Sequence, residues 1–426
     1  MHTRSSTQRL RPTSALPGLC VLGLCVLGSA LSAQVAEGAD AGRTLTQDLE
    51  LFAEARAGLE AGVRDGTFNG VVALVDVDGE LIFEAAIGER DASGAPMTAD
   101  TIFQIYSMTK PVTAVAALVL CEEGAFDLDD PVAELLPALG GREVFVAGAG
   151  GAADTREPAL REMTVRDLLR HTAGLTYGIF DTSPVDRMLL AAGVFDEANT
   201  SADLVEILAG VPLKSQPGTR FEYSLASDVL GRLVEVASGV SLDAFLEDRV
   251  FGPLGMRDTG FHVGEADLDR TADVYRRGLG GLKEVPRETR SALGSAPPMA
   301  SGGGGLFSTA RDYLRFCRML AEGGALDGTR ILRAETVDAM LSDQLAGISA
   351  SSSALQGGGF GFGLGVMTRD TGRGPRAGTA WWGGLAGTGF WIDREERMVG
   401  IFMIQNMGEL GHADRFRADV YRDIGR

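Results

Sequence analysis

The pattern of hydrophobic and polar positions changes its period along the chain. Helical spacing over residues 45–63 gives way to two apolar runs, 71–77 and 80–88, which are separated by Asp78-Gly79. An Asp-Gly pair between two such runs is a strong signal for a two-residue β-hairpin. The sequence therefore predicts a helix and then a hairpin in this first part of the chain.

The middle of the chain has mostly helical patterns. Nearly every residue from Val112 to Leu120 is apolar, which predicts a helix that is surrounded by protein on all sides. Shorter helices, some opened by a capping residue, are expected at 132–136, 164–170, 201–209, 226–237, 242–251, 310–321 and 334–341.

Strand-like patterns return near the end of the chain, and a last amphipathic helix is expected there. Sheet at both ends with helices between them predicts an α+β fold, in which an antiparallel sheet flanked by helices is built from both termini. We expect residues 34–105 and 355–426 to form this sheet domain, and residues 106–354 to form an inserted, mostly helical domain. The late strands and the closing helix are expected at 360–367, 380–391, 398–405 and 412–424.

The first residues have the composition of an export signal. Arginines at positions 4, 9 and 11 precede an apolar core, 16–31, and small residues offer a cleavage site near Ser32 or Ala33. We therefore expect a signal peptide over residues 1–33 and a periplasmic or secreted protein. An uncleaved anchor helix is the alternative.

Composition and charge narrow the possible partners. The chain is 45% hydrophobic and 23% charged, as globular proteins are, and its formal net charge is −19. This charge argues against nucleic acid and against anionic membrane surfaces as partners. Outside the signal only Cys121 and Cys317 remain, which is too few for a disulfide framework, so buried free thiols are expected.

The opening turn of the apolar helix carries a serine and a lysine three residues apart, Ser107 and Lys110. At that spacing the two side chains lie on one face of a helix and can touch. The chain has only three lysines, and lysine, unlike arginine, can lose its proton when it is desolvated. We expect the apolar setting to lower the pKa of Lys110, so that it can activate Ser107 as a nucleophile. The alternative is a surface lysine at a helix end.

Other chemical sites are less well supported. His171 suggests a serine–histidine pair, but the chain has no Gly-x-Ser-x-Gly turn, which argues against an α/β-hydrolase. We expect His171 to fix the loop at the end of its helix by hydrogen bonding. Neither a His-Glu-x-x-His motif nor a cysteine cluster is present, so no metal site is expected. The glycine run 302–305 lacks the Lys-Ser/Thr pair of a phosphate loop and is expected to be a tight turn near the site.

Three further stretches accompany the serine–lysine pair. They are Tyr223-Ser224-Leu225, the glycine-rich segment 301–309 and the segment 381–388. In order and spacing these motifs resemble the serine β-lactamase and penicillin-binding-protein superfamily, in its class C-like branch. The resemblance covers nearly all of the chain after the signal, and it implies a β-lactamase-like fold.

The resemblance also implies catalytic roles. Ser107 would be the nucleophile, Lys110 its base partner, and Tyr223 the residue that shares the proton and hands it to the leaving group. The backbone N–H groups of Ser107 and Leu385 would form the oxyanion hole, one of them at a helix N-terminus.

Two departures from the superfamily pattern bear on the substrate. β-Lactamases of this branch have Asn where this chain has Leu225, and Lys or His, Thr and Gly where it has Trp382, Gly383 and Gly384. An indole cannot hold a substrate carboxylate as a cation does, but it offers a flat apolar wall. Both departures resemble the carboxylesterase offshoot called family VIII. The residues expected in the substrate pocket are Trp382, Gly383, Gly384, Tyr177 and Leu225.

These observations together predict a serine hydrolase that needs no cofactor and no metal. The favoured function is a carboxylesterase that cleaves short-chain or small esters through an acyl-enzyme on Ser107. A β-lactamase or D,D-peptidase of the same fold is one alternative, and a non-catalytic binding protein is another. The segments 181–199 and 278–298 are expected to border the pocket and to set its selectivity.

Overall fold

A computed structural model gives the fold of the protein. It describes residues 51–425, apart from 149–152, 288–289, 291, 351–354, 356–357 and 373. The signal peptide expected over residues 1–33 lies outside the described residues. In the part of the chain that is described, every helix is too short or too polar to span a bilayer.

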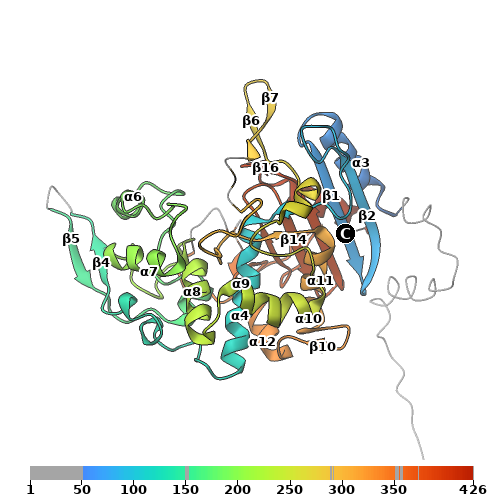
Figure 1. Ribbon diagram of the computed structural model, residues 1–426. Coiled ribbons are helices and arrows are strands. Elements are labelled where there is room, and N and C mark those ends of the chain that lie inside the picture. The colour runs from blue at the N-terminus through green and yellow to red at the C-terminus, as the bar shows by residue number, and fades with distance from the viewer. Residues whose placement is uncertain are drawn as a thin grey trace, which may run out of the picture. The chain divides into compact units, whose positions relative to one another are not determined.

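The largest sheet has seven strands, all paired antiparallel (Figure 1). Its strand order is β11-β12-β13-β14-β15-β1-β2, so strands from the two ends of the chain lie side by side. At that junction Leu74 of β1 is opposite Ile401 of β15. The strands are β1 (Gly70–Val77), β2 (Glu80–Gly88), β11 (Gly359–Phe360), β12 (Gly365–Val366), β13 (Ala380–Gly383), β14 (Gly389–Asp393) and β15 (Met398–Met403).

Helices cover both faces of this sheet. Phe390 and Trp391 are consecutive on β14, so their side chains point to opposite faces. Phe390 packs against Tyr313 of α11 with ring centroids 5.3 Å apart, and Trp391 packs against Phe416 of α13 at 5.7 Å. Because both faces are covered, β1 and β15 are buried along almost their whole length instead of alternating. The helices are α3 (Ala53–Arg64), which packs beside α13, α11 (Ala310–Ala321) and α13 (His412–Asp423).

The helical part of the chain is built around α4 (Thr109–Glu122). Its residues are all buried from Thr109 to Leu120, as the apolar pattern predicted, and α8 packs along it. Three other helices, α5, α6 and α7, begin with a capping box, in which a Thr or Ser and the Asp three residues later bind each other's backbone N–H groups. The remaining helices and turns include η1 (Tyr106–Met108), α5 (Val165–Leu169), α6 (Pro184–Ala191), α7 (Ser201–Gly210), α8 (Ala226–Ser238), α9 (Leu242–Leu246), η4 (Glu247–Phe251), α10 (Gly252–Leu254), η5 (Glu265–Arg270) and α12 (Ala334–Met340).

Short strand pairs tie the loops to one another. β3 (Phe103–Gln104), which directly precedes the serine–lysine segment, pairs with β8 (Phe307–Ser308). The other pairs are β4 (Glu143–Val146) with β5 (Thr155–Pro158), β9 (Ala325–Leu326) with β10 (Thr329–Arg330), and the hairpin β6 (Tyr275–Gly278) and β7 (Gly281–Glu284) with β16 (Asn406–Met407).

The structure confirms the predicted fold class. An antiparallel sheet is built from both ends of the chain, and the helical elements come between them. The strands and the helices share one continuous hydrophobic core. The domain boundaries expected at 105/106 and 354/355 stay predictions.

Several predicted elements differ in detail. The run 380–391, expected as a continuous strand, forms β13 and β14, because the chain turns between them where the Gly384 N–H donates to the Thr388 carbonyl at 2.8 Å. The run 360–367 likewise forms β11 and β12, with Gly363 in the left-handed region at φ +80°. The pattern 132–136 forms a 3₁₀ turn, and 242–251 divides into α9 and a π-helical turn.

Both remaining cysteines are free thiols, as expected. Cys317 is buried and Cys121 is half-buried. Burial raises the pKa of both thiols, and the pKa of Cys121 reaches about 12. Neither is therefore a thiolate at neutral pH, and neither is a nucleophile.

Candidate active site

A strained turn places Ser107 at the beginning of the buried helix. Before the turn, the Ile105 N–H donates to the Leu306 carbonyl at 2.9 Å, which continues the pairing of β3 with β8. Tyr106 then adopts a left-handed backbone conformation with φ +45°, which is uncommon for an aromatic residue. Strain of this kind is kept where the surrounding structure enforces it, as at functional sites. Ser107 follows in η1, and α4 continues from it.

The structure brings the three predicted catalytic residues together. The Tyr223 hydroxyl donates to the Ser107 Oγ at 2.8 Å, and the Lys110 Nζ donates to the same oxygen at 3.2 Å. Ser107 lies in η1 and Lys110 in the first turn of α4, which continues from η1, whereas Tyr223 comes from the loop before α8. The serine oxygen therefore has two proton-carrying groups within hydrogen-bond distance.

Lys110 is completely buried, with 0% of its surface exposed. Its Nζ donates to the Gly303 carbonyl at 2.6 Å, in addition to its bond with Ser107. The same nitrogen lies 4.7 Å from the ring centroid of Tyr223 and 5.3 Å from that of Tyr177. The alternative of a surface lysine is therefore wrong, and the buried charge is held by a carbonyl and two aromatic rings.

The pKa of Lys110 differs from the expectation. Burial alone lowers it, but the oxygens of Tyr177 and Tyr223 and the Asp228 carboxylate outweigh burial, so the pKa of the ammonium group is raised. The prediction that the apolar setting lowers this pKa is wrong, because loops distant in sequence bring polar groups to an otherwise apolar helix. Lys110 thus carries its proton at neutral pH.

Asp228, on α8, is a residue of the site that the sequence did not reveal. Its Oδ1 accepts hydrogen bonds from the Ser301 hydroxyl at 2.5 Å and from the Gly303 N–H at 3.0 Å. Gly303 in turn offers its carbonyl to Lys110. A Cβ at Gly303 would lie 2.3 Å from the Asp228 Oδ2, so only glycine fits there. Asp228 therefore positions the loop that holds Lys110.

The glycine run 302–305, expected as a tight turn near the site, forms that loop. The N–H groups of Gly304 and Gly305 both donate to the Ser301 carbonyl, at 3.2 and 2.9 Å. The one sequence signal for Asp228 is its position five residues after Tyr223. That signal has meaning only when the glycine loop is known to pack against α8.

The turn between β13 and β14 is pressed against the backbone that precedes Ser107. The Thr388 hydroxyl donates to the Ile105 carbonyl at 3.3 Å. A Cβ at Gly384 would lie 2.4 Å from that same carbonyl oxygen, so glycine permits the close approach. Leu385, the next residue of the turn, is the predicted second oxyanion donor. That role stays a prediction.

Aromatic rings surround the Tyr223 side of the site. The rings of Tyr223 and Tyr177 are stacked with centroids 5.5 Å apart, and Trp382 lies 5.6 Å from Tyr223 and 5.1 Å from Phe360. Trp382 and Leu225 are both buried. Gly383 and Gly384 lie at the end of β13 and in the turn after it. The contribution of these residues to a substrate pocket stays a prediction.

His171 holds the segment that carries Tyr223, as expected for a loop-fixing residue. Its Nδ1 lies 3.1 Å from the Ser224 hydroxyl, and its carbonyl accepts from the Glu222 N–H at 2.8 Å. The ring centroid is 5.0 Å from that of Tyr223. Burial, reinforced by the charge of Lys110, holds the pKa of His171 well below its usual value. His171 is therefore neutral and acts on the site through its neighbours.

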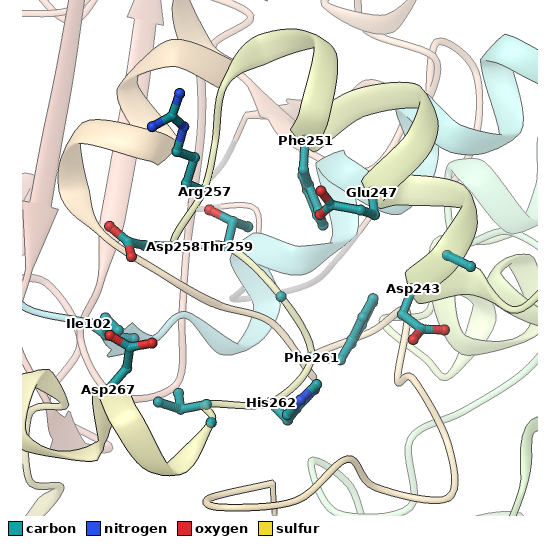
Figure 2. A pocket seen from close by; sticks show the side chains of 14 residues that line it. Ile102, Asp243, Glu247, Phe251, Arg257, Asp258, Thr259, Phe261, His262 and Asp267 are labelled. Carbon is teal, nitrogen blue, oxygen red and sulfur yellow. The ribbon is translucent and has the colours of Figure 1, made fainter.

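A separate cavity of about 360 Å³ lies between α9, η4 and the loop 257–264 (Figure 2). None of Ser107, Lys110 and Tyr223 lines it. Its acidic side chains include Asp258, which pairs with Arg270 at 2.8 Å. Among the described residues, no group of three or more histidine, cysteine or acidic side chains is placed to hold a metal ion.

Comparison with known proteins gives a consistent result. The family model described as Beta-lactamase matches residues 51–422. Esterase EstB of Burkholderia gladioli is 34% identical over 367 residues, which cover 81% of this chain and 88% of the relative. Lovastatin esterase of Penicillium rubens is 32% identical over 396 residues, which cover 85% of this chain and 96% of the relative. The solved structure of EstCE1, a hydrolase with promiscuous acyltransferase activity, has a TM-score of 0.74 at 26% identity and covers 89% of this chain and 99% of that one.

The neutral, buried state of His171 predicts a pH-dependent stability. In the unfolded chain a histidine titrates near pH ~6.5, and in the folded protein the pKa of His171 is lower, so the unfolded state binds more protons in mild acid. The free energy of unfolding is expected to fall as pH drops below ~6.5, by up to about 1.4 kcal/mol per pH unit. Urea unfolding of wild type and His171→Asn at several pH values measures this slope.

The slope is expected to be shallower in His171→Asn, because Asn tolerates the left-handed backbone of this position, φ +55°, and does not titrate. The exposed His262 supplies the control: His262→Asn is expected to keep the wild-type slope. Equal slopes in wild type and His171→Asn would contradict the account of a buried neutral imidazole.

Proposed function

Because the chain belongs to the beta-lactamase family, we propose that it is a carboxylesterase, which cleaves small esters through an acyl-enzyme on Ser107. The observation that carries this proposal is the Ser107 oxygen, bound at 2.8 Å by Tyr223 and at 3.2 Å by a completely buried Lys110. A serine oxygen held by two groups that can exchange a proton is the arrangement that nucleophilic catalysis needs.

Acylation begins when the Lys110–Tyr223 pair, after losing one proton, takes the proton of Ser107. The serine oxygen forms a bond to the ester carbonyl carbon, and an electron pair moves onto the carbonyl oxygen. The backbone N–H groups of Ser107 and Leu385 donate hydrogen bonds to that oxyanion. When the intermediate collapses, the bond to the alcohol oxygen breaks and Tyr223 supplies the proton to that oxygen.

Deacylation repeats these steps with water. The Lys110–Tyr223 pair takes a proton from a water molecule, whose oxygen attacks the acyl carbonyl carbon. The bond between that carbon and the Ser107 oxygen then breaks, the serine regains its proton from the pair, and the acid leaves. Both groups bind the same Ser107 oxygen and can pass a proton to each other through it, so the proton is assigned to the pair and not to one member.

Two residues favour esters over β-lactams. The strand position at which a β-lactamase carries a cation is occupied here by Trp382, a buried indole among aromatic rings. Leu225 is likewise buried and apolar where an amide would be. A substrate carboxylate would find no positive charge to pair with at either position, whereas an uncharged ester needs no such ion pair. The names of the two esterase relatives point in the same direction.

The rival function, a β-lactamase or D,D-peptidase, needs a cation elsewhere near Ser107. Burial raises the pKa of the neighbouring Tyr106 phenol, and the charges of Arg290 and Arg276 act against this increase. Arg290 belongs to the segment expected to border the pocket, so it is the group that would bind a carboxylate if this rival were right.

We also propose that the protein is exported and acts on a small molecule. Support comes from the arginine-led apolar segment at residues 1–33 and from the net charge of −19, which disfavours nucleic acid as a partner. The two free, high-pKa thiols leave no role for cysteine in the reaction. No cofactor enters any step above.

The central role of Ser107 predicts the effect of its removal. In Ser107→Ala, kcat/KM for p-nitrophenyl acetate and butyrate is expected to fall by roughly a thousandfold or more, since no other described serine has these two partners. The wild type is expected to hydrolyse a chromogenic cephalosporin far more slowly than the esters. Ser342→Ala is the matched control and should retain wild-type rates, because Ser342 is an exposed serine after the end of α12 whose hydroxyl binds the Asp338 carbonyl.

Each unexpected outcome has a definite meaning. Ester turnover that survives in Ser107→Ala would mean that Ser107 is not the nucleophile. A wild type that prefers the cephalosporin would establish the rival function.

The raised pKa of Lys110 predicts an alkaline activity profile. The Lys110–Tyr223 pair must lose a proton before it can accept one, so kcat/KM for an ester is expected to rise with pH through the neutral range, by up to about tenfold per pH unit. Asp228→Asn removes a negative charge that raises the pKa of Lys110. In this variant the rising limb of the pH profile, over which kcat/KM increases, should therefore move to lower pH. The maximal rate should fall, because the glycine loop is less firmly held.

The exposed Asp243, on α9, supplies the matched control for that series. Asp243→Asn is expected to keep both the position of the limb and the maximal rate. A loss of rate in Asp228→Asn without any shift of the limb would mean that Asp228 acts only on the shape of the loop, and not on the charge of Lys110.

A further inference from the structure

One segment beside the site exposes an unusual amount of apolar surface. This segment, residues 177–195, contains α6, and we call it the flap. Of the eleven large apolar side chains most exposed in the described part of the chain, five lie in the flap. Phe180 is 58% exposed and Phe195 is 47% exposed. Exposed apolar side chains that gather in one segment can mark a site for a ligand or a partner. The five residues are Ile179, Phe180, Met188, Leu190 and Phe195.

Ring contacts connect this exposed surface with the reacting atoms. Tyr177 stacks on Tyr223, and Phe195 stacks on Tyr177 with ring centroids 6.3 Å apart. Phe180 lies 5.1 Å from Tyr177 and 5.7 Å from Tyr223. An unbroken row of aromatic rings therefore leads from the hydroxyl that binds Ser107 outward to solvent.

The flap is anchored to the site by buried polar contacts. Asp186, in the first turn of α6, accepts hydrogen bonds from the Thr176 and Ser183 hydroxyls. Lys214 lies 3.5 Å from the Asp186 carboxylate and 3.2 Å from that of Glu222, the residue before Tyr223. The exposed rings are thus held at a fixed place relative to Tyr223, which lowers the entropic cost of binding an apolar group on them.

We propose that the flap binds the alcohol part of the substrate, and that this part is a large apolar group. The inference rests on the proposed function. In that mechanism Tyr223 gives its proton to the leaving oxygen, so the group attached to this oxygen begins at Tyr223, where the row of rings also begins. The preferred substrates are therefore esters of bulky apolar or aromatic alcohols with small acids.

The matched test is a pair of ester series. In the alcohol series the acid is always acetic acid, and the alcohol grows from ethanol to butanol, hexanol and 2-phenylethanol. In the acyl series the alcohol is always ethanol, and the acid grows from acetic to hexanoic. Acid release in a pH-stat gives kcat/KM for wild type, Phe180→Ser, Phe195→Ser and the double variant. Leu81→Ser, an exposed leucine on the edge strand β2, is the control.

For the wild type, kcat/KM for hexyl acetate is expected to exceed that for ethyl acetate by roughly tenfold. In the double variant this ratio should fall to about twofold, because the two serines remove the apolar surface that the longer alcohol covers. The ratio across the acyl series, and both ratios in Leu81→Ser, should stay as in the wild type.

Three results would overturn the inference. An unchanged alcohol ratio in the double variant would mean that the flap does not contact the substrate. A change confined to the acyl series would place the acid, and not the alcohol, on the flap. A wild type that sediments as a dimer and a double variant that sediments as a monomer would make the flap an interface between copies of the chain. Failure of the wild type to hydrolyse any ester would instead contradict the proposed function itself, and the inference would fall with it.

Discussion

The ammonium group of Lys110 is buried completely, and the arrangement of the site follows from that constraint. A buried charge is costly unless hydrogen bonds and opposite charge replace the water it has lost. The Gly303 carbonyl at 2.6 Å, the Ser107 oxygen at 3.2 Å and the rings of Tyr177 and Tyr223 provide this replacement. Each comes from a different part of the chain. The fold must therefore bring these parts together around one nitrogen before any chemistry is possible.

The architecture meets this requirement from two directions. The sheet pairs β1 with β15, from the two ends of the chain, and the turn after β13 is pressed against the Ile105 carbonyl just before the nucleophile. The helical part supplies the other side, where Asp228 holds the glycine loop against Lys110 and His171 holds the segment that carries Tyr223. Glycine at positions 303 and 384 is needed for packing, since a Cβ at either would overlap a neighbouring oxygen.

Much of this could be predicted from local sequence, and the reasons for the rest are physical. The hairpin around Asp78-Gly79, the burial of α4 from Thr109 to Leu120 and the resemblance to the β-lactamase superfamily depend on short patterns, and the structure and the family match confirm them. The division of 380–391 into two strands depends on how closely a turn approaches another segment, which periodicity does not record. The pKa of Lys110 is raised against burial by two tyrosines and Asp228, which are distant in sequence and which the apolar pattern of the helix does not record.

The central claim is that Ser107 carries the acyl group during turnover. The most direct measurement is mass spectrometry of the protein quenched in acid during hydrolysis of p-nitrophenyl butyrate, followed by peptide mapping. The account predicts a mass increase of one butyryl group on the peptide that contains Ser107, and no such increase in Ser107→Ala. A butyryl group on another residue, or ester turnover in which the protein is never acylated, would contradict it.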